Sequence, residues 1–226
     1  MTELAYVLPA ILACVLIAPT VCSGSLAMHG YVTIPAGDFG DALGEDAGLA
    51  NTGFGLGLEL ALPVGGPGLS WASDASILFN GFDLGAFKEN AGGVAEVGWW
   101  WNVPLLTGLR YDAAASPEAS MYGTVLAGLS IAKTPDFKWS GQMFDGYDLH
   151  AVDMDQEASF ATSLGFEVGG GLVIGHDLDI SLRYLNLGTP EFHVHTEVTT
   201  DGHTEARRIT SKKSISMFLI SVGLRF

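Results

Sequence analysis

The last thirteen residues of the sequence, Ser214 to Phe226 (SISMFLISVGLRF), decide the fold class. The side chains at even-numbered positions form one face and those at odd-numbered positions form the other. This alternation over the whole stretch predicts a β-strand. The apolar set runs to the last residue, the aromatic Phe226. A strand that closes a barrel in a membrane needs such an ending, because it pairs with the first strand and places an aromatic ring at the lipid–water boundary. The two predicted faces are Ser216, Phe218, Ile220, Val222, Leu224 and Phe226, and Met217, Leu219, Ser221, Gly223 and Arg225.

Seven earlier stretches carry the same alternation. In the clearest of them, residues 53–63, leucines and a phenylalanine alternate with glycines and Glu59. Long and short connections follow one another in turn, and both termini lie at the short-turn end, as in outer-membrane barrels. The sequence therefore predicts an all-β fold, an eight-stranded antiparallel up-and-down transmembrane β-barrel. The other predicted strands are 29–35, 69–80, 99–112, 120–132, 160–174 and a strand that begins at Leu178.

Composition agrees with a membrane barrel and excludes some functions. The mean hydropathy of the 226 residues is +0.33, yet no apolar run after residue 22 is long enough for a transmembrane helix. The 30 glycines suit the crowded interior of a narrow barrel. The net charge of −15 argues against nucleic acid as a partner, since nucleic-acid binding needs basic patches.

The N-terminal segment resembles a secretory signal peptide. An apolar run from Leu4 to Pro19 is followed by small residues, which predicts a signal peptide over residues 1–27, cleaved near 23–27, and a barrel domain over 28–226. The segment departs from the usual pattern, since Glu3 precedes the apolar run and no Lys or Arg does. Both cysteines, Cys14 and Cys22, lie in it, so the mature chain would have none. Lipid modification of Cys22 is disfavoured, because Pro19 and Val21 fit that motif badly.

Aromatic residues mark the expected edges of the lipid-facing band. Trp101 and Tyr111 share one face and are ten residues apart, which at the usual rise and tilt of a barrel strand spans about 25 Å, the height of the apolar band. The predicted lipid-interface girdle is Trp71, Trp99, Trp101, Tyr111 and Phe226.

Several short motifs together resemble the small outer-membrane β-barrel superfamily, with its porin-like and outer membrane protein A-like members. The resemblance covers the chain after the N-terminal segment and implies a fold and an outer-membrane location, but no particular function. The motifs are Ile34-Pro35-Ala36-Gly37-Asp38-Phe39, Asn102-Val103-Pro104-Leu105-Leu106, Gly108-Leu109-Arg110-Tyr111, Leu182-Arg183-Tyr184 and Val222-Gly223-Leu224-Arg225-Phe226.

The inward faces carry charged residues that the short turns bring together. The turn at Gly65 to Gly68 places Glu59 opposite Asp74, and Arg110 on the next strand is the candidate cation between them. These charges are interpreted as ion pairs that fill the lumen of an eight-stranded barrel, with a proton or cation relay as the alternative. The predicted lumen cluster is Glu59, Asp74, Arg110, Glu167, Asp179, Arg183 and Arg225, with Glu167 diagonal to Arg183.

A histidine-bearing hairpin is predicted around Asp201-Gly202, with residue numbers of paired positions summing to 403. His193 and His195 would then lie on the opposite face from His203, which disfavours a three-histidine metal site. No catalytic residue, metal site or cofactor is assigned. Acidic stretches such as Asp145 to Glu157 are interpreted as solvated loops that could also bind cations bridging lipopolysaccharide phosphates.

A register shift is predicted between this hairpin and the membrane-spanning parts of its two strands. A sum of 403 pairs odd with even positions, whereas the outward residues of both strands are even-numbered, so the sum must change by one. A β-bulge near Gly188, somewhere between Leu185 and Ser211, would achieve this. A change to 404 would place Asp179 opposite Arg225.

Three functions stay open at this stage. The favoured one is a non-enzymatic outer-membrane barrel with a structural or surface-interaction role. The others are a transporter or binder of small or apolar ligands, and a lipid-modifying enzyme. The expected partners are outer-membrane lipid and lipopolysaccharide, and the insertion machinery, which would read the C-terminal strand.

Overall fold

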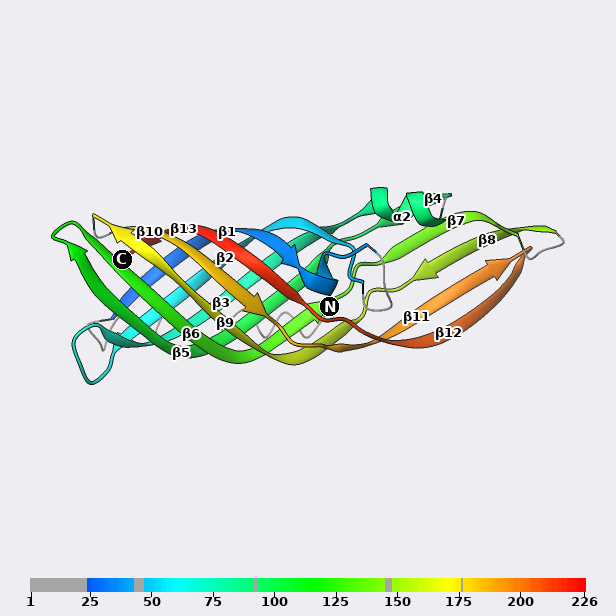
Figure 1. The fold of residues 1–226 in the computed structure, drawn as a ribbon. Helices are drawn as coiled ribbons and strands as arrows, with labels where there is room; N and C mark the ends of the chain where they lie inside the picture. Colours follow the sequence, from blue (N-terminus) through cyan, green and yellow to red (C-terminus); the bar gives the residue numbers. More distant parts are fainter. Residues whose placement is uncertain (1–23, 43–46, 92, 145–147, 176) are drawn as a thin grey trace.

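The computed structural model describes residues 24–42, 47–91, 93–144, 148–175 and 177–226. Eight antiparallel strands close into a barrel, in the order β1-β13-β10-β9-β6-β5-β3-β2. This confirms the predicted fold class (Figure 1). The predicted signal peptide lies outside the described residues, apart from its last four positions. The barrel strands are β1 (Ser25–Ala36), β2 (Ala50–Pro63), β3 (Leu69–Phe82), β5 (Trp100–Ser116), β6 (Ala119–Lys133), β9 (Phe160–Ile174), β10 (Leu178–Asn186) and β13 (Ser216–Arg225).

The last strand closes the barrel against the first, as predicted. β13 pairs with β1 from Ala27 opposite Arg225 to Ala36 opposite Ser216. Beyond this ladder, the backbone N–H of Phe226 donates to the carbonyl oxygen of Leu26 at 2.7 Å. Among the described residues, no helix is both long enough and apolar enough to cross a membrane.

A second sheet continues the barrel on the long-loop side and occupies the right half of Figure 1. Its strand order is β12-β11-β8-β7-β4, and each strand adjoins in sequence one barrel strand, in the same spatial order as β13-β10-β9-β6-β5. The barrel wall is thus prolonged along five of its eight strands. We call this the external sheet: β4 (Val94–Val97), β7 (Phe137–Phe144), β8 (Leu149–Gln156), β11 (Glu191–Thr200) and β12 (His203–Lys212).

The external sheet corrects the interpretation of the acidic stretch from Asp145 to Glu157 as a solvated loop, because two strands lie within the segment 135–157. That segment holds β7 and β8, which pair from Phe137 opposite Gln156 to Phe144 opposite Leu149. Trp139 and Val152 are buried in one cluster with Ala95 and Phe137. The acidic residues of this segment obscure an alternation that is strong enough to bury one face of the hairpin.

The other three barrel strands lead into shorter structures. A 3₁₀ helix, η2 (Gly37–Phe39), follows β1, and a short α-helix, α2 (Leu84–Ala91), follows β3. The backbone N–H of Asp83 donates to the carbonyl oxygen of Leu49 at 2.7 Å, which holds the start of the helical segment against the chain that enters β2. The α2 helix lies beside the external sheet, where its Phe87 ring contacts Phe137 of β7 at a centroid distance of 4.9 Å.

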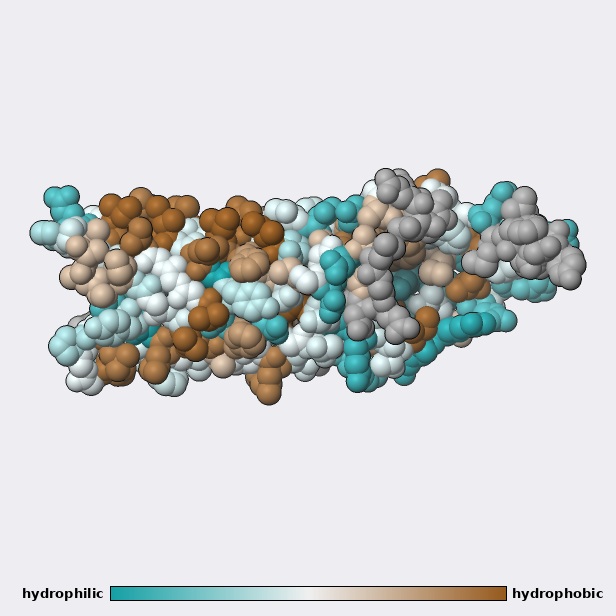
Figure 2. All heavy atoms as spheres, viewed as in Figure 1, coloured by the Kyte–Doolittle hydropathy of each residue, from teal (hydrophilic) through white to brown (hydrophobic). Residues whose placement is uncertain are grey.

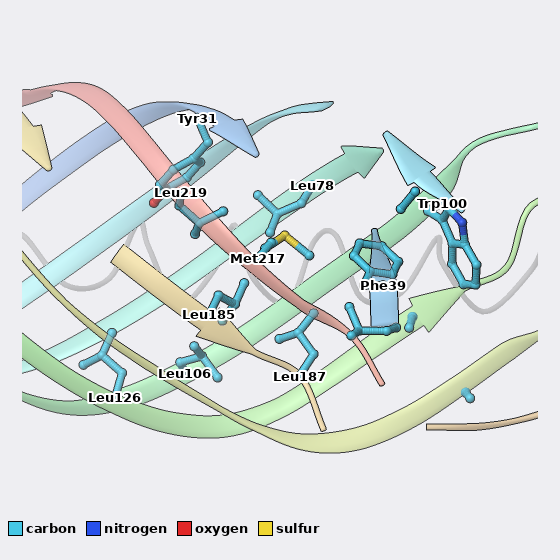
Figure 3. Close-up of a cluster of buried hydrophobic side chains, with 14 of the residues drawn as sticks. Tyr31, Phe39, Leu78, Trp100, Leu106, Leu126, Leu185, Leu187, Met217 and Leu219 are labelled. Carbon is cyan, nitrogen blue, oxygen red and sulfur yellow. The ribbon is translucent and has the colours of Figure 1, made fainter. Parts of the chain in front are cut away.

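The lumen has two layers, and the upper one was not predicted. Towards the short turns it holds buried charged residues, described below. Towards the external sheet it is filled by buried apolar side chains (Figure 3). The inward faces were expected to hold mainly glycine and charge, so this apolar layer corrects that description. Its members include Phe39, Leu78, Trp100, Leu106, Leu126, Leu185, Leu187, Phe192, Ile215, Met217 and Leu219.

The predicted register shift is present at Gly188, but its direction is opposite to the prediction. The hairpin β11–β12 pairs with a sum of 403, as in Thr200 with His203, whereas β10–β13 pairs with a sum of 402. Gly188 has a φ of +71°, and Ile215 bonds to both Leu187 and Gly188. The extra residue therefore sits on the β10 side, which lowers the sum; a sum of 404 would need it on the β13 side.

Candidate functional site

Arg183 is the centre of the charged layer in the lumen. Its side chain is fully buried, and its guanidinium contacts carboxylates from three other barrel strands. Nη2 lies 2.8 Å from Glu59 Oε2, while Nη1 lies 3.1 Å from Glu167 Oε1 and 3.4 Å from Asp74 Oδ2. One side chain thus ties β10 to β2, β9 and β3 across the inside of the barrel.

Arg110 on β5 forms the second centre, closer to the short turns. Its Nη1 pairs with the other oxygen of Glu59, Oε1, and its Nη2 lies 2.9 Å from Asp112 Oδ1. The same guanidinium stacks on the ring of Tyr122, with Cζ 3.4 Å from the ring centroid. Glu59 therefore bridges the two arginines, one through each oxygen.

Two tyrosines complete the network, and the sequence interpretation missed both. The hydroxyl of Tyr31 donates to Asp74 Oδ2 at 3.1 Å, and that of Tyr122 donates to Asp179 Oδ1 at 2.6 Å. A glycine on the inner face of a neighbouring strand makes room for Tyr122: a Cβ added at Gly171 would lie 2.8 Å from the hydroxyl oxygen. Glycines on a luminal face are the sequence signal for such large neighbours.

The structure corrects two details of the predicted cluster. Arg183, not Arg110, lies between Glu59 and Asp74, because it reaches both from across the lumen. Asp179 faces Gly223 in the β10–β13 ladder, so Arg225 is not opposite it. Nη2 of Arg225 instead lies 3.6 Å from Asp112 Oδ1. The predicted pairing of Glu59 with Asp74 and the diagonal placement of Glu167 and Arg183 are confirmed.

The charged layer fills the lumen. Glu59, Asp74, Arg110, Glu167, Asp179 and Arg183 are each at most 3% exposed, and the interior of an eight-stranded barrel is only wide enough for its own side chains. Charges held this tightly to one another connect the strands of the wall across the inside of the barrel. The apolar layer above them separates the network from the external sheet.

The outer wall of the barrel is apolar. Side chains such as Leu56, Val125 and Leu164 are 64%, 63% and 76% exposed, and the apolar surface is concentrated over the barrel half of the molecule (Figure 2). Soluble monomers rarely expose an apolar surface of this extent to water. A closed barrel that spans a lipid bilayer has an apolar outer surface of this kind. The chain folds as a closed β-barrel of the membrane-spanning type.

Aromatic side chains stand at both ends of this wall. Near the short turns, Trp71, Tyr111 and Phe226 are exposed. At the other end Trp99 is exposed and Trp101 is half-buried. There, ring contacts join Trp101 to Phe79, Phe79 to Phe54 and Phe54 to Trp99 at centroid distances of 5.4–5.8 Å.

The histidine hairpin has the predicted register. His195 pairs with Arg208 and Thr200 with His203, so His193 and His195 lie on the opposite face from His203. At its tip, the Asp201 carboxylate contacts His150 Nδ1 and accepts the backbone N–H of Ala151 at 3.2 Å. The contact with His150 lowers the pKa of Asp201.

Comparisons with known proteins find likenesses of fold only. No family model matches the chain, and no curated protein matches its sequence. Among solved structures, Neisserial surface protein A is 14% identical (TM-score 0.43; 89% of this chain and 95% of that chain). Ail, the attachment invasion locus protein of Yersinia pestis, is 14% identical (TM-score 0.47; 91% and 100%). A major outer membrane protein from Thermus thermophilus is 13% identical (TM-score 0.48; 90% and 100%).

Proposed function

We propose that the protein is a non-conducting, non-enzymatic outer-membrane barrel that holds the external sheet at the cell surface for interaction with other molecules. The observation that carries this proposal is the continuity of the two sheets. Five external strands adjoin five barrel strands in the same order, so the external sheet is a rigid extension of a membrane anchor and not a set of loose loops.

The filled lumen supports the structural part of the proposal. Two buried arginines and their carboxylates occupy one half of the interior, and packed apolar side chains occupy the other. A pore for ions or polar solutes would need a continuous polar path past both layers. The same packing gives the barrel the rigidity that a surface platform requires.

Strand β12 is the part of the external sheet best suited to contact a partner. It is an edge of that sheet in the described part of the chain, and nine of its ten residues are exposed. In a protein of net charge −15 it carries Arg207, Arg208 and Lys212. Such charges discourage pairing with a second copy of the same edge and favour an anionic surface molecule as the partner.

The apolar outer wall supports a proposal about the membrane partners. We propose that lipid contacts the apolar band, that lipopolysaccharide contacts its upper rim, and that the insertion machinery reads β13 and Phe226. The remaining candidate, a lipid-modifying enzyme, is tested by mass spectrometry of membrane lipids in a strain that lacks the protein. The non-enzymatic part of the proposal would be overturned if the lipid profile of that strain changed and if supplying the protein again restored it.

The proposal is tested by truncation of the external hairpin. A variant in which a short turn replaces residues 189–214 should still form a heat-modifiable barrel, because β10 and β13 are kept. Reconstituted in nanodiscs, it should lose most of the binding to dextran sulfate that the full chain shows. In planar bilayers both proteins should lack steady ion conductance. Equal binding by the two proteins, or a stable open channel, would overturn the proposal.

A further inference from the structure

A groove of about 330 Å³ lies in the outer wall of the barrel. Its lining comes from six neighbouring strands, β1, β2, β3, β5, β6 and β9. Ala75 accounts for the hollow, because this small side chain lies between Leu58 of β2 and Leu105 of β5, its partners in the two ladders. We call this space the wall groove. Its other apolar members include Leu56, Ile77, Val103 and Ile131.

Lys133 lies at the upper end of the wall groove, in a row with two aromatic side chains. It pairs with Trp101 on β5 and with Phe160 on β9, and its Nζ lies 5.1 Å from the centroid of the Trp101 ring. The aromatic girdles of membrane barrels mark the boundary between the hydrocarbon layer and the headgroups. The ammonium group of Lys133 therefore lies at the depth of the lipid headgroups, beside a groove lined by apolar side chains.

The charge of Lys133 is an exception on the lipid-facing wall. Among the described outward-facing residues of the eight barrel strands, it is the one that carries a charge. No described carboxylate forms an ion pair with it, whereas Lys138 of the external sheet pairs with Asp155. An ammonium at headgroup depth attracts anionic lipid, and the oxygens of a phosphate can accept its N–H groups.

The wall groove and the ammonium together select a lipid, which neither does alone. Lipid chains surround the whole wall, so an apolar groove has no hydrophobic driving force for one chain over another. A chain that packs into the groove gains van der Waals contacts, and the volume is about twice that of an apolar cavity that admits benzene. The ammonium adds selection by charge. The ligand that satisfies both parts has an acyl chain and an anionic phosphate.

We propose that the wall groove binds one molecule of lipopolysaccharide, with a phosphate of its lipid A anchor at Lys133 and one acyl chain along Ala75 and Ile131. Lys133 ends β6, and the chain continues into β7 of the external sheet. The proposed function places that sheet at the cell surface, so the groove would open to the outer leaflet, where lipopolysaccharide lies. The choice of leaflet rests on the proposed function, whereas the affinity for a phosphorylated lipid does not.

The test uses the full mature chain in nanodiscs of phosphatidylcholine, with ¹³C-methyl isoleucine as the reporter and lipid A as the probe. Ile77 and Ile131 line the wall groove, whereas Ile180 is exposed on the wall at β10. A rising mole fraction of lipid A should shift the Ile77 and Ile131 methyl signals in a saturable manner and leave the Ile180 signal in place. Linear shifts at all three methyl groups would show non-selective contact with the lipid mixture and would overturn the proposal.

Two further lipids identify the group that is recognised. Lipid A without its phosphates should not saturate the two groove signals, because Lys133 would lack an anionic partner. Phosphatidylglycerol should saturate them only at a higher mole fraction than lipid A, since each phosphate monoester of lipid A carries a charge of about −1.5 to −2 at pH 7. Saturation by the dephosphorylated lipid would refute recognition of phosphate. Equal or tighter binding of phosphatidylglycerol would overturn the choice of lipopolysaccharide.

Lys133 and Lys138 provide a matched pair of variants. Lys133→Gln should weaken lipid A binding about fivefold or more, because it removes the ammonium group, and Lys133→Arg should keep most of the affinity. Lys138→Gln is the control, since Lys138 is exposed on the external sheet and pairs with Asp155. Equal losses in the two glutamine variants, or no loss in either, would refute the role of Lys133.

Ala75→Leu tests the hollow of the wall groove. The new side chain would fill the groove from the lipid side, so the barrel should stay heat-modifiable while lipid A binding weakens. Ala127→Leu is the control, because Ala127 is exposed on β6 and is not among the described residues that line the groove. Unchanged binding in Ala75→Leu would refute the seat of the acyl chain. The truncation of residues 189–214 keeps every lining strand and should bind lipid A like the full chain, so this titration and the test of the surface role can fail separately.

Discussion

Replacement of Arg183 by methionine tests how the charged layer stabilises the barrel. The variant keeps most of the side-chain volume and removes the guanidinium, which lies within 3.4 Å of Glu59, Asp74 and Glu167. All three carboxylates would stay buried with one fewer cation. Loss of one partner from a buried ion pair typically costs about 3–5 kcal/mol, and we expect a loss in this range. The folding equilibrium constant would fall by about two to more than three orders of magnitude.

The assay is equilibrium unfolding in guanidinium chloride from lipid vesicles, followed by tryptophan fluorescence and by heat-modifiable migration on a gel. Arg207→Met is the matched control, because Arg207 is exposed and pairs only with Glu205 in the described structure. An exposed pair of this kind contributes little, about 0–1 kcal/mol. A loss for Arg183→Met as small as that for Arg207→Met would refute the view that the charged layer stabilises the barrel.

A second substitution separates the loss of the ion pairs from the loss of packing. Glu167→Gln in the Arg183→Met background removes a carboxylate that, among the described residues, pairs with Arg183 alone. If uncompensated charge causes the instability, the double variant should be more stable than the sum of the two single losses predicts. Strict additivity would assign the effect to packing instead.

Three further predictions concern other parts of the molecule. Gly171→Ala should destabilise the barrel by about 1–3 kcal/mol in the same unfolding assay, since its Cβ would lie 2.5 Å from the carbonyl oxygen of Ile180 and 2.8 Å from the Tyr122 hydroxyl. Gly123→Ala, whose Cβ would meet its nearest neighbour at 3.8 Å, should cost little. Phe226→Ala should reduce the amount of heat-modifiable barrel in the outer-membrane fraction, and equal amounts would remove its role in assembly. Asp201→Ala should speed hydrogen exchange of the Ala151 amide in β8, which its carboxylate accepts, and unchanged exchange would contradict that contact.

The barrel itself could be predicted because alternation with period two is a strong signal when one face must meet lipid. The residues Phe218, Ile220, Val222 and Leu224 show it plainly, and the structure exposes all four. Short turns made local register predictable as well: Glu59 faces Asp74, and Thr200 faces His203. In each case a tight turn fixes which residues pair.

Contacts across the lumen could not be predicted in the same way. Arg183 and Asp74 are 109 positions apart, and their contact depends on the tilt of every strand between them. The even numbering of the outward residues on both strands required the sum of paired residue numbers to change by one near Gly188. This requirement does not say which strand takes the extra residue. The apolar upper lumen was missed because Leu185, Leu187 and Met217 interrupt the expected contrast between an apolar outside and a polar inside.

The central claim is that the apolar faces of the strands contact lipid while the lumen is filled. Two adjacent residues of β5 test it directly, because Trp101 lines the outer wall and Trp100 is buried inside. Single-tryptophan proteins that keep one or the other would be reconstituted with brominated lipids. The account predicts strong quenching of Trp101 and little quenching of Trp100. Quenching of Trp100 by lipid, with Trp101 quenched instead by iodide in water, would mean that the two faces are inverted and would contradict the account.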